Sequence, residues 1–193
     1  MNMHKLRLLA LLAVFPVIAS VLSGCVAAVV GGAGTAVLVG EDRRTVGTVT
    51  EDQGIELKSG QRVGDRFKDA HINVTSFSRM VLITGEVTDA ATRTEIEKIV
   101  RAVENVRGVY NEITVGNVTP LSARANDSFI TSKVKARFVD QRLFNPVHVK
   151  VVTEASAVYL LGLVKRKEAD DAVEITRTTS GVQKVVKLFE YLD

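Results

Sequence analysis

The sequence contains one cysteine and three histidines among its 193 residues. A single cysteine, Cys25, excludes an internal disulfide framework and any zinc or iron–sulfur site built from several thiolates. The three histidines, His4, His71 and His148, are too few for a conventional transition-metal site. We therefore expect no metal and no dissociable cofactor.

The short motifs of the common catalytic sites are also missing. The chain has no H-E-x-x-H, G-x-S-x-G, P-loop or dinucleotide fingerprint. The stretch "GGAG" at 31–34 lacks the lysine and hydroxyl residue that complete a phosphate-binding loop. The acidic pair Asp170 and Asp171 falls on the surface of an expected helix, where solvation explains it. We therefore expect that the protein is not an enzyme.

Charge is unevenly distributed along the chain. Of the net charge of +3, residues 1–24 carry +2, so the side chains of the remainder carry +1. Within that remainder, residues 124–193 carry +3 while residues 41–123 carry −2. The C-terminal third is therefore the part best suited to meet an anionic surface.

The N-terminus has the pattern of a secretory signal. Lys5 and Arg7 precede the apolar run "LLALLAVFPVIASVL", which is shorter than the roughly 20 residues that a membrane-spanning helix needs. The run ends in Leu22-Ser23-Gly24-Cys25, which resembles the bacterial lipobox. We predict a lipoprotein signal peptide over 1–24 and lipidation of Cys25 by a diacylglycerol and an N-acyl chain. An ordinary signal peptide with an incidental cysteine is the alternative.

Val26 follows Cys25 where many inner-membrane lipoproteins have Asp, so by analogy we expect an outer-membrane protein that faces the periplasm. This compartment and the small charge of the mature chain argue against a nucleic-acid partner. The next residues, "VAAVVGGAGTAVLVGEDRR", are rich in glycine and have no polar face. We interpret 25–44 as a flexible tether; a strand packed on the first domain is the alternative.

The rest of the chain contains an internal repeat. At an offset of 77, His71 aligns with His148 and Gly85 with Gly162, and the apolar positions of the two copies coincide. One deletion then shifts the offset to 76, which places Asn105 on Gly181. The sequence therefore predicts two copies of one module.

Each copy has the same expected elements. Two alternating, β-branched runs over 72–77 and 79–87 predict a hairpin. Residues 89–105 predict a helix with Asp89 as its N-cap, which ends at Asn105 in the left-handed conformation, as its counterpart ends at Gly181. A last strand follows, and another helix precedes each hairpin, with Asp127 as the N-cap in the second copy.

The order helix, strand, strand, helix, strand predicts an α+β fold with two helices on one face of a three-stranded sheet. We place the first domain at 45–117, a linker at 118–124 and the second domain at 125–193. Each module alone is near the size at which a single core is marginal, so pairing would stabilise both. We expect the mature protein to be monomeric.

The repeat resembles the BON domain of bacterial periplasmic and osmotic-response proteins, in the strand before each aligned glycine and in "NVRGVYNEI" and "SGVQKVV". The whole arrangement of lipobox, tether and two repeats is similar to the dual-BON outer-membrane lipoproteins. This resemblance implies a non-enzymatic protein that binds anionic phospholipid such as phosphatidylglycerol, supports outer-membrane integrity and associates with the division site. The family pattern has a tryptophan near the start of the second copy's first helix, where this chain has Phe129.

The face on which Phe129 lies can be derived from helical geometry. At 100° per residue, Ile130, Val134 and Phe138 form the core stripe, and Phe129 lies off it, beside Lys133 and Ala136. An aromatic ring flanked by a lysine suits an interfacial contact with lipid, and Phe129 could instead pack under the other module or the tether. The candidate phospholipid-binding residues are Phe129, Lys133, Lys135, Ala136 and Arg137.

A second basic patch consists of Lys165, Arg166 and Lys167, at the start of the last helix. Its ordinary interpretation is a solvated helix start balanced by nearby acidic residues. The main alternative to lipid binding for the whole protein is an adaptor for envelope protein partners that assemble the outer membrane or remodel peptidoglycan.

Overall fold

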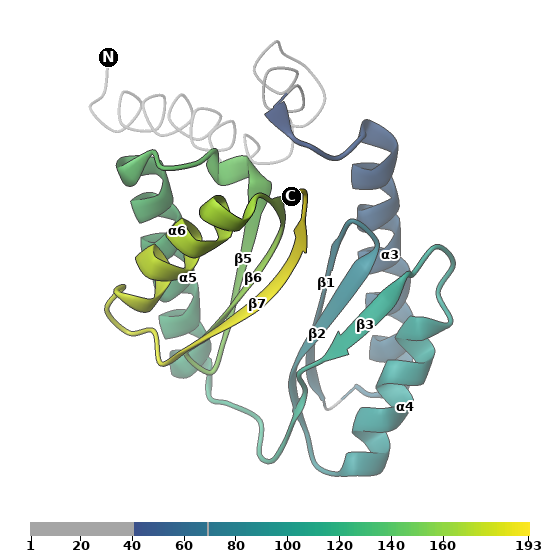
Figure 1. Cartoon of the computed structure of the whole chain (residues 1–193). Helices are drawn as coiled ribbons and strands as arrows, with labels where there is room; N and C mark the ends of the chain where they lie inside the picture. Colours follow the sequence, from purple (N-terminus) through teal and green to yellow (C-terminus); the bar gives the residue numbers. More distant parts are fainter. Residues whose placement is uncertain (1–40, 69) are drawn as a thin grey trace, which may run out of the picture. The chain divides into compact units, whose positions relative to one another are not determined.

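The computed structural model describes residues 41–68 and 70–193, and Asp42–Asp193 form one compact unit. Figure 1 shows its helices and strands. The predicted signal peptide, Cys25 and the tether up to residue 40 lie outside the described residues. In order, the elements are α3 (Val46–Arg66), β1 (His71–Phe77), β2 (Met80–Val87), α4 (Ala90–Arg101), β3 (Gly108–Asn111), β4 (Thr114–Val115), α5 (Leu121–Gln141), η3 (Pro146–His148), β5 (Val149–Glu154), β6 (Ala157–Val164), α6 (Arg166–Arg177) and β7 (Lys184–Tyr191).

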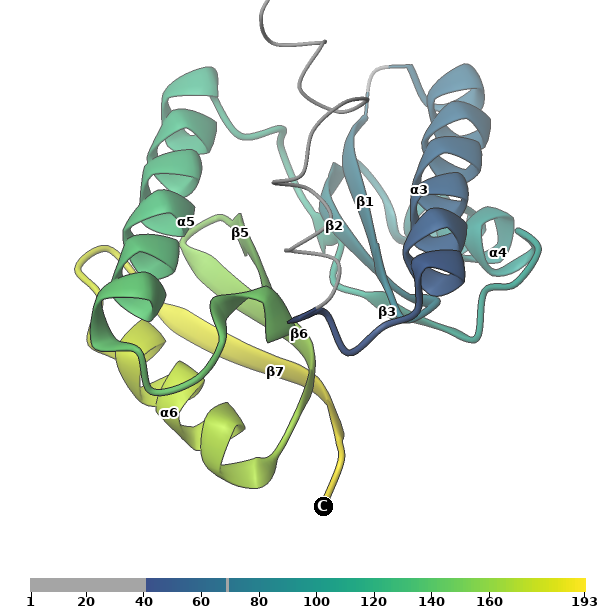
Figure 2. The same cartoon turned by 90° about the horizontal axis from the view of Figure 1, so that it is seen from above.

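Both copies fold as the predicted α-β-β-α-β module. In the first, β2 pairs antiparallel with β1 and parallel with β3; in the second, β6 pairs in the same way with β5 and β7. Figures 1 and 2 show α3 and α4 on one side of the first sheet, and α5 and α6 on one side of the second. The α+β fold class and the two helices on one face of each sheet are confirmed.

The predicted start of α4 is confirmed, whereas its predicted end is four residues too late. Asp89 caps α4 by accepting a 2.8 Å hydrogen bond from the backbone N–H of Thr92. Asn105 and Gly181 have φ of 66° and 99°, so both adopt the predicted left-handed conformation. The helices themselves end four residues earlier, at Arg101 and Arg177, so these residues close the turns that follow α4 and α6 and do not end the helices.

The last strand of the first module differs from the prediction, because it is broken into β3 and β4. The Asn111 side chain accepts from the N–H of Ile113 and donates to the carbonyl of Arg93. These side-chain bonds compete with the sheet ladder for the backbone at this point. Ile113, 2% exposed, instead inserts into the core of the first module.

Asp127 is not the N-cap of α5, which corrects the sequence prediction. The helix begins at Leu121, inside the predicted linker, and places Asp127 in its second turn. There the carboxylate accepts 2.9 Å hydrogen bonds from the N–H groups of Ala155 and Ser156, the turn of the β5–β6 hairpin. Side-chain contacts between a helix and a distant turn leave no local signal in the sequence.

Asp52 makes the same contact in the first module. Its carboxylate accepts from the N–H groups of Ser78 and Arg79 at 2.8 and 2.7 Å, and from the Ser76 hydroxyl at 2.6 Å. Ser78, Arg79 and their counterparts Ala155 and Ser156 all have φ between 48° and 64°. Each hairpin therefore has a two-residue turn of left-handed residues that are not glycine, held from behind by a buried aspartate.

The apolar residues form three clusters. Val81 and Ile83 point from β2 into the core beneath α3 and α4, and Val158 and Leu160 do so from β6 beneath α5 and α6. The strand residues between them face the other way, so Leu82, Tyr159 and Leu161 meet in a third cluster that joins the two sheets. The expected pairing of the modules is therefore achieved through their helix-free faces.

The residues just before α3 bind the folded unit. Arg43, which we placed in the tether, makes a bidentate contact of 2.6 and 2.8 Å with Glu168 on α6 and donates to the carbonyl of Leu163. Arg44 binds Asp42 and Asp52 and lies 4.0 Å from the centre of the Phe77 ring. The segment that precedes α3 therefore contacts both modules, the second through Arg43 and the first through Arg44.

The Arg43–Glu168 pair gives stability a pH dependence. Hydrogen bonds and charge from the Arg43 guanidinium lower the pKa of Glu168 from 4.5 to about 2. A carboxyl whose pKa falls on folding stabilises the fold above its unfolded pKa and loses this contribution as pH falls through the folded value. Because the pair is partly exposed, we expect about 1 to 2 kcal/mol, present above pH 4.5 and lost towards pH 2.

The measurement is the carboxyl ¹³C titration of Glu168 by NMR, with urea unfolding at pH 7 and pH 3. In Arg43→Met the midpoint should move towards 4, and the loss of stability should be larger at pH 7 than at pH 3. Lys167→Met is the control, because Lys167 forms only an exposed pair with Asp171. An unchanged Glu168 midpoint in Arg43→Met would show that the pair does not set this pKa.

Candidate functional site

The buried and the exposed residues of helix α5 lie on the faces that helical geometry predicts. Ile130, Val134 and Phe138 are at most 1% exposed and form part of the second core. Phe129, one position away from this stripe, is 62% exposed. The ring thus packs neither under the first module nor in a core of the described chain, and it lies on the outer face of the helix.

Lys133 is held beside this ring. Its Nζ lies 4.8 Å from the centroid of Phe129, and the ammonium donates to the backbone carbonyl of Ser180 in the loop after α6. A cation near the face of an aromatic ring interacts favourably with its π electrons. The exposed residues on the same face include the small Ala125, Ser132 and Ala136 beside Phe129, together with Asn126 one turn earlier and Asp140 three turns further along. Phe129 is therefore the most prominent apolar group on this face, with a positive charge at its side.

The other two predicted residues point elsewhere. Lys135 is exposed on the flank of α5, about 120° around the helix from Phe129, and lines a groove together with Val139. Arg137 is turned towards α6, where its Nη1 donates to the carbonyl of Ile175 and the hydroxyls of Thr178 and Thr179. A cation at the C-terminal end of a helix is stabilising, which gives Arg137 a structural contact that sequence periodicity could not show.

The basic segment Lys165, Arg166 and Lys167 is exposed at the start of α6. The Lys165 N–H donates to the Glu168 carboxylate, Lys167 pairs with Asp171, and the Arg166 guanidinium lies 4.9 Å from the centre of the Tyr191 ring. The Arg166 N–H also donates to the Asp193 carboxylate at 2.9 Å, so acidic groups lie close to all three residues, as the ordinary interpretation of a solvated helix start requires.

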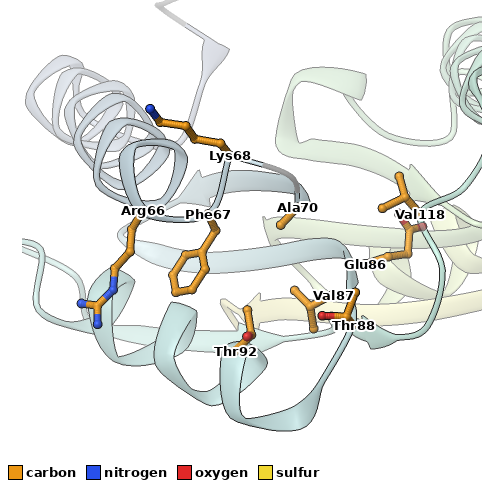
Figure 3. A pocket seen from close by; sticks show the side chains of 9 residues that line it. All are labelled: Arg66, Phe67, Lys68, Ala70, Glu86, Val87, Thr88, Thr92 and Val118. Carbon is orange, nitrogen blue, oxygen red and sulfur yellow. The ribbon is translucent and has the colours of Figure 1, made fainter.

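A cavity of about 220 Å³ opens at the end of the first module and is shown in Figure 3. In this view the side chains of Arg66 and Lys68 point away from its centre. Its polar groups already have partners, since Thr92 donates to Asp89 and Glu86 accepts from Thr119. Its lining, therefore, offers no paired nucleophile and base. The lining residues are Arg66, Phe67, Lys68, Ala70, Glu86, Val87, Thr88, Thr92 and Val118.

A larger groove of about 530 Å³ is lined by residues of both modules. Val49 and Phe77 come from the first module, and Val139, Val147 and Lys135 from the second. Two of the cations that line it have acidic partners, since Lys150 lies 2.7 Å from Glu56 and Arg44 lies 3.0 Å from Asp52.

Two α-β-β-α-β modules, joined through the helix-free faces of their sheets, define a tandem-module α+β protein. The family model of the BON domain matches residues 51–117 and 126–193, so the chain belongs to the BON-domain family. The resemblance that the sequence motifs indicated is confirmed.

Three relatives match most of the chain. It is 39% identical over 179 residues to the outer membrane lipoprotein DolP of Haemophilus influenzae, with 89% of this chain and 91% of that protein covered. It is 29% identical to the 21 kDa hemolysin of Actinobacillus pleuropneumoniae, covering 78% and 79% of the two chains, and 29% identical to the osmotically-inducible protein Y of Escherichia coli, covering 72% of each.

Among residues 41–68 and 70–193, no helix is both long and apolar enough to cross a membrane.

Proposed function

We propose that the protein is a non-enzymatic outer-membrane lipoprotein, anchored by acyl chains on Cys25 and facing the periplasm, whose second BON domain binds anionic phospholipid. The observation that carries the lipid-binding part is the exposed Phe129 on the outer face of α5, with the Lys133 ammonium 4.8 Å from its ring. Similarity to an outer membrane lipoprotein supports the anchor and the compartment. A role in outer-membrane integrity at the division site belongs to the same proposal.

The contact proposed for α5 is shallow. The Phe129 ring inserts between headgroups and acyl chains, and the small neighbours Ala125, Ser132 and Ala136 let the helix approach the surface. Lys133 then meets a phosphate from beside the ring, and Lys135 adds charge on the flank. Arg137 supports the site by fixing α5 to the end of α6.

The energies of this contact are modest. Burial of a phenylalanine side chain contributes roughly 1.5–3 kcal/mol and each lysine about 1 kcal/mol near an anionic surface. The sum corresponds to a dissociation constant of about 1 mM or somewhat below. A tether compensates for such weakness, because Asp42 lies 17 residues after Cys25, a reach of at most about 60 Å. The anchor holds the module near the membrane, and α5 selects the lipid.

Phe129→Glu tests the proposal. In residues 41–193 prepared without the anchor, this substitution should reduce binding to phosphatidylglycerol vesicles at least tenfold, because it removes the inserting ring and adds a repelled charge. Vesicle flotation at low ionic strength measures it. Leu57→Glu is the matched control, since Leu57 is 63% exposed on α3 of the first module, close to the 62% of Phe129. Equal flotation of the two variants would contradict the proposal.

The groove between the modules favours a second candidate function, an adaptor for envelope proteins. Its apolar walls, from Val49 and Phe77 in one module and Val139 and Val147 in the other, suit a protein segment better than a flat lipid surface. The two functions are separable, because Phe129 does not line this groove. A protein partner retained by Phe129→Glu and lost on substitution of Val139 would favour the adaptor.

A further inference from the structure

We propose that His71, Glu86 and Glu154 form a binding site for a divalent zinc ion that joins the two modules. Glu86 and His71 come from the paired strands β2 and β1 of the first module, and Glu154 ends β5 of the second. One ligand atom from each side chain can be chosen so that all three lie within 4.8 Å of one another. Histidine nitrogen and carboxylate oxygen are both ligands of zinc.

The distances place the three groups around one point. His71 Nδ1 lies 3.0 Å from Glu86 Oε2 and 3.9 Å from Glu154 Oε1. Zinc bonds of about 2.0–2.2 Å separate neighbouring ligands of a tetrahedral ion by about 3.2–3.6 Å. The third separation, between Glu86 and Glu154, is at most 4.8 Å, so side-chain shifts of about 1 Å would bring all three ligand atoms to the distances of a zinc ion placed between them.

Neighbouring side chains orient both carboxylates. The Thr84 hydroxyl and the Asn73 amide each donate at 2.9 Å to Glu154 Oε2, which leaves Oε1 directed at His71. The Thr119 hydroxyl donates at 2.7 Å to Glu86 Oε1, while Oε2 meets His71 and, at 3.4 Å, the Thr119 N–H. Hydrogen bonds of this kind position ligands in zinc sites.

The cluster also carries uncompensated negative charge. The side chains of Glu86 and Glu154 are 6% and 9% exposed, and within residues 41–68 and 70–193 His71 is their one ion-pair partner within 4.0 Å. Two buried carboxylates beside a single imidazole favour a cation at this point. A divalent cation neutralises both carboxylates, which a proton on His71 cannot do.

The site is accessible from two sides. A cavity of about 370 Å³ is lined by His71, Asn73 and Glu154, and another of about 260 Å³ by Glu86 and Glu154. Cations lie on their walls too, Arg124 in the first and Arg93 and Lys184 in the second. Either cavity provides a path for the ion and room for a water molecule as its fourth ligand.

The repeat itself supplies a control. The counterpart of His71 in the second module is His148, but the residues equivalent to Glu86 and Glu154 are Leu163 and Phe77, at the same offset of 77. His148 therefore lacks the equivalents of both carboxylates, and its Nδ1 instead lies 4.0 Å from Glu168 Oε1. Among the described residues, the three-residue cluster occurs around His71 alone.

Calorimetric titration of the full chain with zinc chloride tests the proposal. The protein is purified in detergent without a histidine tag and stripped of metal. We expect one zinc per chain with a dissociation constant in the micromolar range or below, at least tenfold weaker in His71→Gln and in Glu154→Gln, and unchanged in His148→Gln. Zinc should raise the unfolding temperature of the wild type and of His148→Gln, but not of His71→Gln.

Cobalt(II) gives a direct readout of the ligands, because its visible absorption reports nitrogen and oxygen coordination and should disappear in His71→Gln. Circular dichroism of the metal-free variants shows whether they fold. The absence of stoichiometric zinc binding by the wild type overturns the proposal irrespective of the variants. Equal zinc affinity in folded His71→Gln and His148→Gln also overturns it.

Discussion

Gly85→Ala is expected to destabilise the protein by about 3–5 kcal/mol, a large part of the roughly 5–15 kcal/mol by which an ordinary protein is stable. Gly85 has a φ of 119°, which side-chain-bearing residues rarely adopt. A Cβ built at this position would also lie 1.8 Å from the carbonyl oxygen of His71, on the neighbouring strand. Strand β1 would therefore have to separate from β2 to make room.

Glycine-to-alanine substitutions at two other positions distinguish the effect of the positive φ from that of the close approach. Gly162→Ala, at the equivalent position of the second module, meets the His148 carbonyl at 2.5 Å without a positive φ, so its effect should be smaller. Gly60→Ala, in α3 with no atom within 4 Å of the added Cβ, should stabilise by about 0.5–1 kcal/mol. Urea unfolding measures all three, and a loss for Gly85→Ala no larger than for Gly162→Ala would contradict the close-approach argument.

Asp52→Ala is expected to cost about 3–4 kcal/mol, because it leaves several buried groups without a partner. Asp52 is 3% exposed and accepts from two turn N–H groups and the Ser76 hydroxyl while it pairs with Arg44 at 3.0 Å. Asp127→Ala removes only two N–H contacts and should cost about 2–3 kcal/mol. The loss of stability on substitution by alanine should therefore be largest at Asp52, smaller at Asp127 and close to zero at the exposed Asp140.

A second substitution tests the mechanism. Ser78→Asn with Arg79→Gly supplies the residues that favour two consecutive left-handed positions, so it should recover part of the loss in Asp52→Ala. Chemical denaturation of the single and combined variants measures this coupling. If Asp52→Ala unfolds like Asp140→Ala, or if Asn-Gly gives no recovery, the aspartate does not hold the turn.

Much of the fold could be predicted because its signals are local. The alternation of apolar and polar residues predicted both hairpins, and Asp89 predicted the start of α4. The residue types of Asn105 and Gly181 predicted the left-handed positions that follow the helices. The errors arose where distant residues decide the structure. Asp127 has the residue type of an N-cap, but its carboxylate binds a turn 28 residues further along the chain.

In the candidate site, too, the features with a local signal could be predicted and those that depend on distant residues could not. Helical periodicity placed Phe129 off the core stripe, and the structure has it exposed. It could not assign Arg137 to the end of α6 or Lys133 to Ser180, because these contacts depend on how α6 lies beside α5. Nor could a count of three histidines reveal that His71 meets two carboxylates, one of them supplied by the other module.

Paramagnetic relaxation by a spin-labelled phospholipid is the most direct test of the central claim, that the outer face of α5 contacts anionic lipid. Residues 41–193 are mixed with phosphatidylglycerol-containing bicelles, and the broadening of each backbone amide is measured. We predict that the broadening centres on Phe129, Lys133 and Ala136 and is lost in Phe129→Glu. Broadening centred on Leu57 in α3, or none above that of neutral bicelles, would contradict it.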